Sequence, residues 1–215
     1  MAPGRGGSAS PVTVSHAIGR MDLLPTLLST GWASGVNAYL TVALLNLLGR
    51  AGVGEVPESM QGDAVLVAAL DMFAIEFVAD KVPWLDSAWD AVHTVVRPAI
   101  AGALGLGFAE ADGVEGLEEA LAGGGTGAIA LASHAVKAGV RLGVNASPEP
   151  FTNIGVSLIE DLLVAGVVSL ALENPVEAAV LAGVLLAGGL ALVLLVASRI
   201  RRALNSRRRG GAGPP

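Results

Sequence analysis

The 215-residue sequence contains no cysteine. That absence excludes disulfide bonds, thiolate metal sites and a cysteine nucleophile. Charged residues are also scarce, at 15% of the chain, whereas soluble globular proteins carry roughly 25%. So few charges cannot cover the surface of a soluble domain of this length.

Apolar residues, in contrast, make up 53% of the chain, and the mean hydropathy is +0.64. They form long blocks, which is typical of a chain whose solvent is lipid. Residues 23–49 and 178–198 contain no charge, and each run is long enough to cross a bilayer. Four weaker apolar segments lie between them, at 62–80, 89–108, 122–142 and 151–172. The sequence therefore predicts an all-α, polytopic transmembrane helix bundle of about six spans in the cell (inner or plasma) membrane.

The chain divides into three regions by composition. Residues 1–21 are polar, contain Gly, Pro and Ser, and lack the apolar core of a signal peptide, so we expect a disordered N-terminal tail. Residues 22–200 are expected to form the transmembrane helical domain. Residues 201–215 are expected to form a basic, disordered C-terminal tail.

Acidic and basic residues segregate between the predicted loops. If the spans alternate, one side receives the acidic loops near Glu55, Glu115 and Glu173, and the other receives Lys81 and the arginines of 199–209. Because Lys and Arg are retained on the cytoplasmic side, both termini are predicted to be cytoplasmic. The arginine cluster of the tail predicts an anchor on anionic lipid headgroups rather than nucleic-acid binding.

Ionisable residues inside the predicted spans are the most informative feature. Four of the spans carry one polar stripe each at helical spacing, as Glu76 and Asp80 do. At about 1.5 Å of rise per residue, the stripes overlap roughly 8–14 Å from the cytoplasmic ends. A charge at the bilayer centre costs about 2.5–3.5 kcal/mol, so these side chains must face one another or water. The predicted buried cluster consists of Glu76, Asp80, Arg97, His134, Lys137, Arg141, Glu160 and Asp161.

The cluster has two interpretations. It can be an interhelical ion-pair network that fixes the packing, or a hydrated, cytoplasm-facing cavity that binds an ion or a small polar solute. We interpret His93 and His134 as hydrogen-bonded helix contacts rather than metal ligands, so we predict no metal and no cofactor. Asn37, alone in a charge-free run, either packs or hydrogen-bonds to the cluster.

Three separated motifs carry a resemblance. They are GVNAYL at 35–40, EFVADKVP at 76–83 and HAVKAGVR at 134–141. In this order they resemble the bacterial membrane family catalogued as domain of unknown function 4126, over about residues 22–200. The resemblance implies a small multi-helix inner-membrane protein and carries no established activity.

Our leading functional hypothesis is a transporter or channel-like protein whose site is lined by the eight cluster residues. A first alternative is a non-transporting scaffold or assembly protein, in which the charges only pair. A second is a membrane enzyme acting on a lipid or another amphiphile, with His134 or Glu160 as general acid/base, although no nucleophile motif supports it. A homo-oligomer is a further possible partner arrangement.

Overall fold

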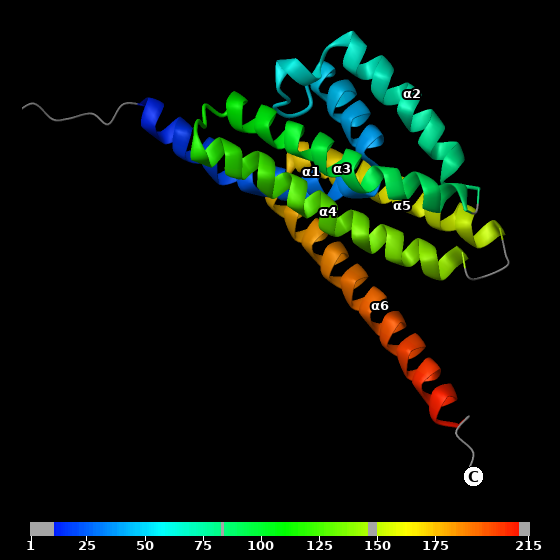
Figure 1. Ribbon diagram of the computed structural model, residues 1–215. Coiled ribbons are helices and arrows are strands. Elements are labelled where there is room, and N and C mark those ends of the chain that lie inside the picture. Colours follow the sequence, from blue (N-terminus) through cyan, green and yellow to red (C-terminus); the bar gives the residue numbers. More distant parts are fainter. Residues whose placement is uncertain (1–10, 83, 146–149, 211–215) are drawn as a thin grey trace, which may run out of the picture.

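The computed structural model describes residues 11–82, 84–145 and 150–210, and over these ranges the chain is helical without strands (Figure 1). This confirms the predicted all-α bundle, and each predicted apolar segment coincides with one α-helix. The elements are α1 (Pro11–Arg50), the short 3-10 helix η1 (Glu58–Met60), α2 (Asp63–Ala79), α3 (Leu85–Ala111), α4 (Leu117–Asn145), α5 (Pro150–Glu173) and α6 (Pro175–Gly210).

Helical structure extends beyond the predicted 22–200 domain at both ends. α1 begins at Pro11 and α6 continues to Gly210, within the segments for which the sequence predicts disordered tails. Extending an existing helix needs no new nucleation, so polar residues next to an apolar helix can continue it. Residues 1–10 and 211–215 of the predicted tails lie outside the described residues.

Three helices of the described chain are long and apolar enough to cross a membrane. They are Leu85–Ala111, Phe151–Glu173 and Pro175–Arg199, from α3, α5 and α6. Little of the last one is buried inside the protein, as expected for a helix surrounded by hydrocarbon. The total number of spans stays a prediction.

α1 is not one continuous helix. Asn37 has the extended angles φ −149° and ψ 97°, which separates a first half, 11–36, from a second half, 38–50. A cavity at one end of the bundle is lined by Asp22, from the first half of α1, and by Glu55, which lies just beyond the end of the second half. The two halves therefore start and finish at the same end, and Figure 1 shows the lighter-blue second half leaving the first at a steep angle.

The prediction that residues 23–49 form a single span is therefore wrong. A charge-free run indicates burial in an apolar medium, but it carries no information about whether the helix is straight. The described chain also begins and ends at opposite ends of the molecule, at Pro11 and Gly210 (Figure 1). The location of both termini on one side of a membrane stays a prediction.

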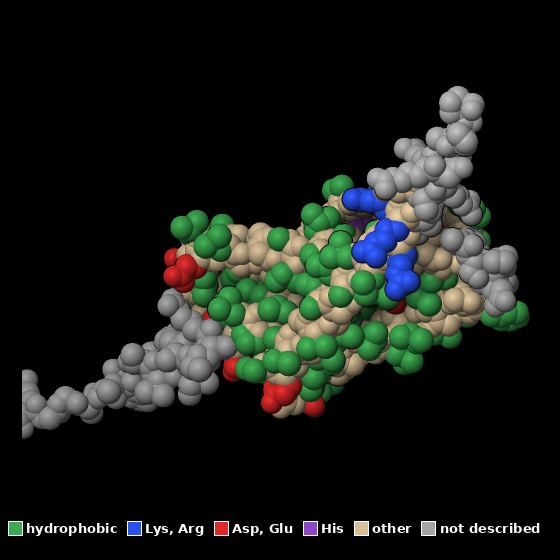
Figure 2. Space-filling model, turned by 90° about the horizontal axis from the view of Figure 1, so that it is seen from below, with side chains coloured by type: hydrophobic (Ala, Val, Ile, Leu, Met, Phe, Trp, Pro, Cys, Tyr) green, Lys and Arg blue, Asp and Glu red, His purple; other side chains and the backbone are tan. Residues whose placement is uncertain are grey.

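We call the end with the cavity the acidic end, because Asp22, Glu55, Asp112 and Glu173 all line it. In Figure 2, acidic side chains gather toward one end of the visible face and basic side chains toward the other. The segregation of charge predicted from the loops is thus present in the folded chain.

α1 lies at the centre and packs against each of α2 to α6. It approaches α4 closely, because glycine lets the two backbones come into contact. A Cβ atom at Gly35 would overlap the carbonyl oxygen of Ala130 and the hydroxyl of Ser133, and one at Gly31 would lie 3.0 Å from the carbonyl oxygen of Thr126. The Gly-x-x-x-Gly spacing at 31 and 35 therefore serves close helix packing.

Gly35→Ala should destabilise the protein by about 1–3 kcal/mol, because the added methyl group has no space against α4. The measurement is thermal unfolding of the detergent-solubilised protein. Gly143→Ala is the matched control, since a Cβ there meets nothing within 4 Å. Equal unfolding temperatures for the two variants would contradict the close α1–α4 contact.

Candidate functional site

Ionisable side chains from α2, α3, α4 and α5 meet around the break in α1. The buried bases are Arg97, Lys137 and Arg141, with relative exposures of 0%, 4% and 1%. The structure brings all eight residues of the predicted cluster into this region: Glu76 of α2 and Asp80 at its C-cap, Arg97 of α3, His134, Lys137 and Arg141 of α4, and Glu160 and Asp161 of α5.

Arg97 holds the part of the cluster between α2, α3 and α4. Its Nη2 donates to Oε1 of Glu76 at 2.5 Å, and its Nη1 lies 3.2 Å from Oδ1 of Asp90. Nη1 also lies 2.6 Å from Nδ1 of His134. A guanidinium can only donate, so Nδ1 accepts and the ring proton is on Nε2. That proton is directed to the carbonyl oxygen of Asp90, 3.0 Å from Nε2.

Lys137 occupies the middle of the cluster. Its Nζ donates to Oδ2 of Asp80 at 2.8 Å and to the carbonyl oxygen of Val36 at 3.0 Å. Carboxylate oxygens of Glu76 and Glu160 lie 3.6 and 3.8 Å from the same Nζ. The ammonium group thus connects α2 and α5 to the end of the first half of α1.

Arg141 joins α2 to α5. Nη2 donates to Oε2 of Glu160 at 2.6 Å and to Oδ2 of Asp80 at 3.2 Å. Nη1 donates to the carbonyl oxygen of Asp80 at 2.6 Å and to Oδ1 of Asn153 at 3.0 Å, and lies 3.7 Å from a carboxylate oxygen of Asp86. The predicted cluster omits Asp86, Asp90 and Asn153, although the last two lie on the polar stripes of α3 and α5.

The break in α1 is part of the site because it frees backbone groups. In an unbroken helix the carbonyls of Gly35 and Val36 would bond to amides four residues later. Here Arg97 donates to the first at 3.3 Å and Lys137 donates to the second at 3.0 Å. Cationic side chains thus replace the helical hydrogen bonds that are lost at Asn37.

Asn37 itself uses both ends of its side-chain amide. Oδ1 accepts from the backbone N–H of Leu40 at 2.9 Å, which caps the second half of α1. Nδ2 donates to Oδ1 of Asp161 at 3.0 Å. From the sequence, Asn37 could either pack or hydrogen-bond to the cluster, and its capping role was not predicted. The strong preference of Asn for helix N-caps is the signal that could have revealed it.

Acidic groups outnumber the bases they contact. Glu76, Asp80, Asp86, Asp90 and Glu160 all lie within 4.0 Å of Arg97, Lys137 or Arg141. Buried oxygens without a hydrogen-bond donor remain on Glu76, Asp80, Asp90 and Asp161. Because unneutralised charge is costly in a medium of low dielectric constant, the described side chains leave capacity for a proton or a small cation.

The two histidines make hydrogen-bonded helix contacts. Nδ1 of His93 lies 2.7 Å from the carbonyl oxygen of Trp89, its Nε2 lies 2.9 Å from the hydroxyl of Tyr39, and its ring stacks on Trp89 at 4.4 Å. His134 is held between Arg97 and Asp90 as described above. Across the described residues, no group of three or more His, Cys, Asp or Glu is placed to hold a metal ion.

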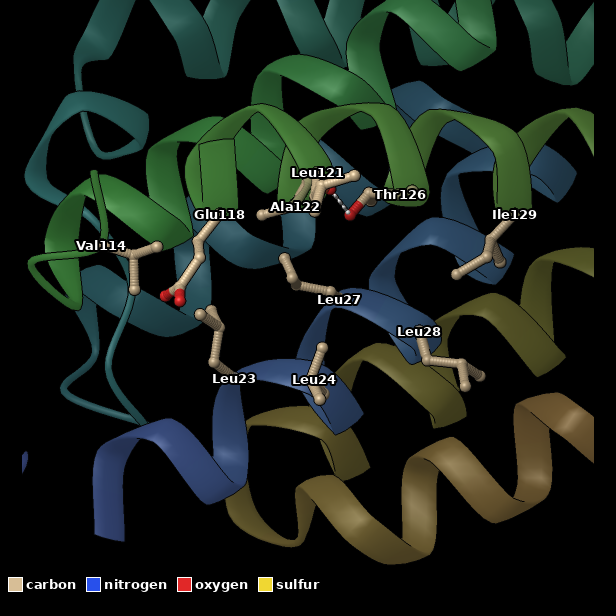
Figure 3. A pocket seen from close by; sticks show the side chains of 11 residues that line it. Leu23, Leu24, Leu27, Leu28, Val114, Glu118, Leu121, Ala122, Thr126 and Ile129 are labelled. Atoms are coloured by element: carbon tan, nitrogen blue, oxygen red, sulfur yellow. Dashed lines mark hydrogen bonds between the residues drawn. The ribbon is translucent and has the colours of Figure 1, made fainter. Parts of the chain in front are cut away.

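Two cavities lie away from the cluster. The cavity at the acidic end has a volume of about 300 Å³. The larger one, of about 590 Å³, lies between the first half of α1 and α4. Its lining is mainly apolar and includes five leucines, with Glu118 at one end (Figure 3). No cluster residue lines either cavity.

The described chain is an all-helical bundle, and three of its helices are long and apolar enough to cross a membrane. Within that class, the chain belongs to the family described as "Domain of unknown function (DUF4126)", whose model matches residues 24–199. No curated protein and no solved structure matches the chain. The family membership predicted from the three motifs is confirmed.

Arg97→Met should destabilise the protein by about 3–5 kcal/mol, because it leaves buried carboxylates without their counter-ion. The measurement is the unfolding temperature of the purified protein. Arg50→Met is the control, since Arg50 pairs with Asp63 at an exposed position, where ion pairs contribute little. A second Glu76→Gln substitution should recover part of the loss, and additive losses would show that Arg97 and Glu76 are not coupled.

Proposed function

We propose that this chain is a multi-pass protein of the cell membrane that transports or conducts an ion or a small polar solute. The buried cluster is its binding site. The observation that carries the proposal is the break of α1 at Asn37, among buried charges in the centre of the bundle.

Broken helices within a membrane have a limited set of uses. Non-helical backbone at membrane depth is tolerated where it is buried in protein or lines a cavity. Helices interrupted at mid-depth build the substrate and ion sites of many transporters, because their free backbone groups bind charge. Here, the freed carbonyl of Val36 and the carboxylates of Asp80 and Glu160 surround the ammonium group of Lys137. The freed carbonyl of Gly35 accepts from Arg97 beside it.

The scaffold alternative is favoured by a different observation. Each buried base already contacts at least two carboxylates, and mutual pairing needs no ligand. The surplus of carboxylates distinguishes the two functions, since a network made only for packing would be balanced. The apolar cavity does not support the enzyme alternative, because neither His134 nor Glu160 lines it.

Glu160→Gln should leave the protein inserted and folded but abolish solute flux, because it removes the charge of the least buried carboxylate that pairs with two bases. The measurement is a screen of labelled ions and small polar solutes in proteoliposomes, with and without a pH gradient. Glu119→Gln, at the acidic end of α4, is the control and should retain flux. Normal flux in Glu160→Gln would remove this residue from the site, and no wild-type flux for any solute would favour the scaffold.

Membrane topology gives a second test. If α2 to α6 each cross once and α1 enters and returns, five crossings place the ends of the chain on opposite sides. Because Lys and Arg are retained in the cytoplasm, a reporter after Pro215 should be cytoplasmic, and a reporter before Met1 should be external. Two cytoplasmic reporters would restore the six-span arrangement.

A further inference from the structure

Asp161 differs from the other acids of the site because no basic side chain pairs with it. Within the part of the chain that the structure describes, no nitrogen of Lys, Arg or His lies within 4.0 Å of its carboxylate. Its neighbour Glu160 contacts both Arg141 and Lys137. One turn of α5 therefore presents one carboxylate with counter-ions and one without.

The polar contact of Asp161 is with the residue that breaks α1. Asn37 Nδ2 donates to Oδ1 at 3.0 Å, while Oδ2 is buried and has no hydrogen-bond partner. A buried ionised carboxylate with one neutral donor is strongly disfavoured, and such groups take a proton instead. With its hydrogen on Oδ2, the neutral acid keeps the bond that Oδ1 accepts and leaves only an uncharged group without a partner, which costs less than a buried charge.

We propose that Asp161 is a reversible proton-binding site of the cluster and that Asn37 transmits its charge state to the break in α1. In the protonation step, the ionised carboxylate takes a proton from a hydronium ion. An O–H bond forms at Oδ2, a water molecule is left, and the negative charge of the carboxylate is neutralised. Coupling of this proton to the movement of a solute rests on the proposed function. The proton-binding site itself does not depend on transport.

Loss or gain of this proton affects groups on each neighbouring element. Asp80 and Lys81 from the end of α2 and Lys137 from α4 interact electrostatically with Asp161, and the uncharged amide of Asn37 from α1 donates a hydrogen bond to it. Lys81 currently donates to the carbonyl of Phe77 and to the hydroxyl of Ser157, and Lys137 donates to Asp80. When Asp161 loses its proton, the new charge attracts these two lysines.

The second half of α1 responds to the same charge. Its N-terminus begins just after Asn37 and carries the positive end of the helix dipole. An ionised Asp161 therefore draws the amide of Asn37 and this helix end toward α5, whereas the neutral acid releases them. Lys137, which holds the carbonyl of Val36 on the other half of α1, is pulled in the same step. Protonation thus acts on both sides of the break.

Infrared difference spectroscopy of the full-length protein in proteoliposomes tests this inference directly. A change from acidic to alkaline buffer should remove a carboxylic-acid C=O absorption in the wild type, with an amplitude near one group per chain. Asp161→Asn should lack the band, and Glu119→Gln should retain it. Wild-type protein carrying ¹³C-labelled aspartate should show the band at lower frequency, which assigns it to an aspartate, and its loss in Asp161→Asn identifies which one.

Asn37→Ser provides the second variant, because serine retains an N-cap but is too short to donate to Asp161. Its band should remain and change in frequency. An identical band in Asp161→Asn, or none in the labelled wild type, would overturn the inference. Loss of the wild-type band on adding sodium or potassium at constant pH would identify a cation site in place of the proton site. A proton band without any solute flux would refute transport alone, and flux without this band would refute the proton site alone.

Discussion

The cost of removing charge from water constrains most of this structure. Arg97, Lys137 and Arg141 lie inside a bundle of apolar helices, and each would be strongly destabilising alone. Their partners come from α2, α3 and α5 and from the backbone of α1. No single helix carries a neutral set, so the helices must converge at one level for any of them to be tolerated. The arrangement of the bundle is thus set by charge at its centre and by apolar packing elsewhere.

The break in α1 and the buried bases stabilise each other. An interrupted helix inside hydrocarbon leaves carbonyl oxygens without partners, which costs several kcal/mol per group in the absence of water. Arg97 and Lys137 fill two of these positions, and Asn37 caps the helix that follows. A continuous α1 would remove these acceptors from both bases. The glycines at 31 and 35 bring α1 close enough to α4 for the contact with Lys137 to form.

Most of the helices and most of the cluster residues could be predicted from the sequence, because the strongest constraints on the fold act over short stretches of the chain. Long apolar blocks determine the helices, and stripes of ionisable residues at helical spacing identify the four helix faces that meet. The path of α1 could not be predicted, since a charge-free run is equally compatible with one span and with a helix that returns. Asp86 was missed because it lies at the first turn of α3, outside the predicted span. Asp86 lies beside Arg141 because of the path of the turn after α2, which the sequence pattern does not reveal.

An excess of acidic groups is expected of a binding site and not of a network of ion pairs that only holds helices together. Burying an ion pair rarely stabilises a protein more than apolar side chains of the same size would, so an ion network kept only for packing would at least be neutral. This network is acidic in excess, and the residue outside its pairing scheme, Asp161, bonds to the residue at which α1 breaks. The protonation state of that carboxyl therefore decides how much charge the centre of the bundle must hold. In the proposed proton site, this carboxyl changes the charge beside a broken helix, a function that packing alone would not require.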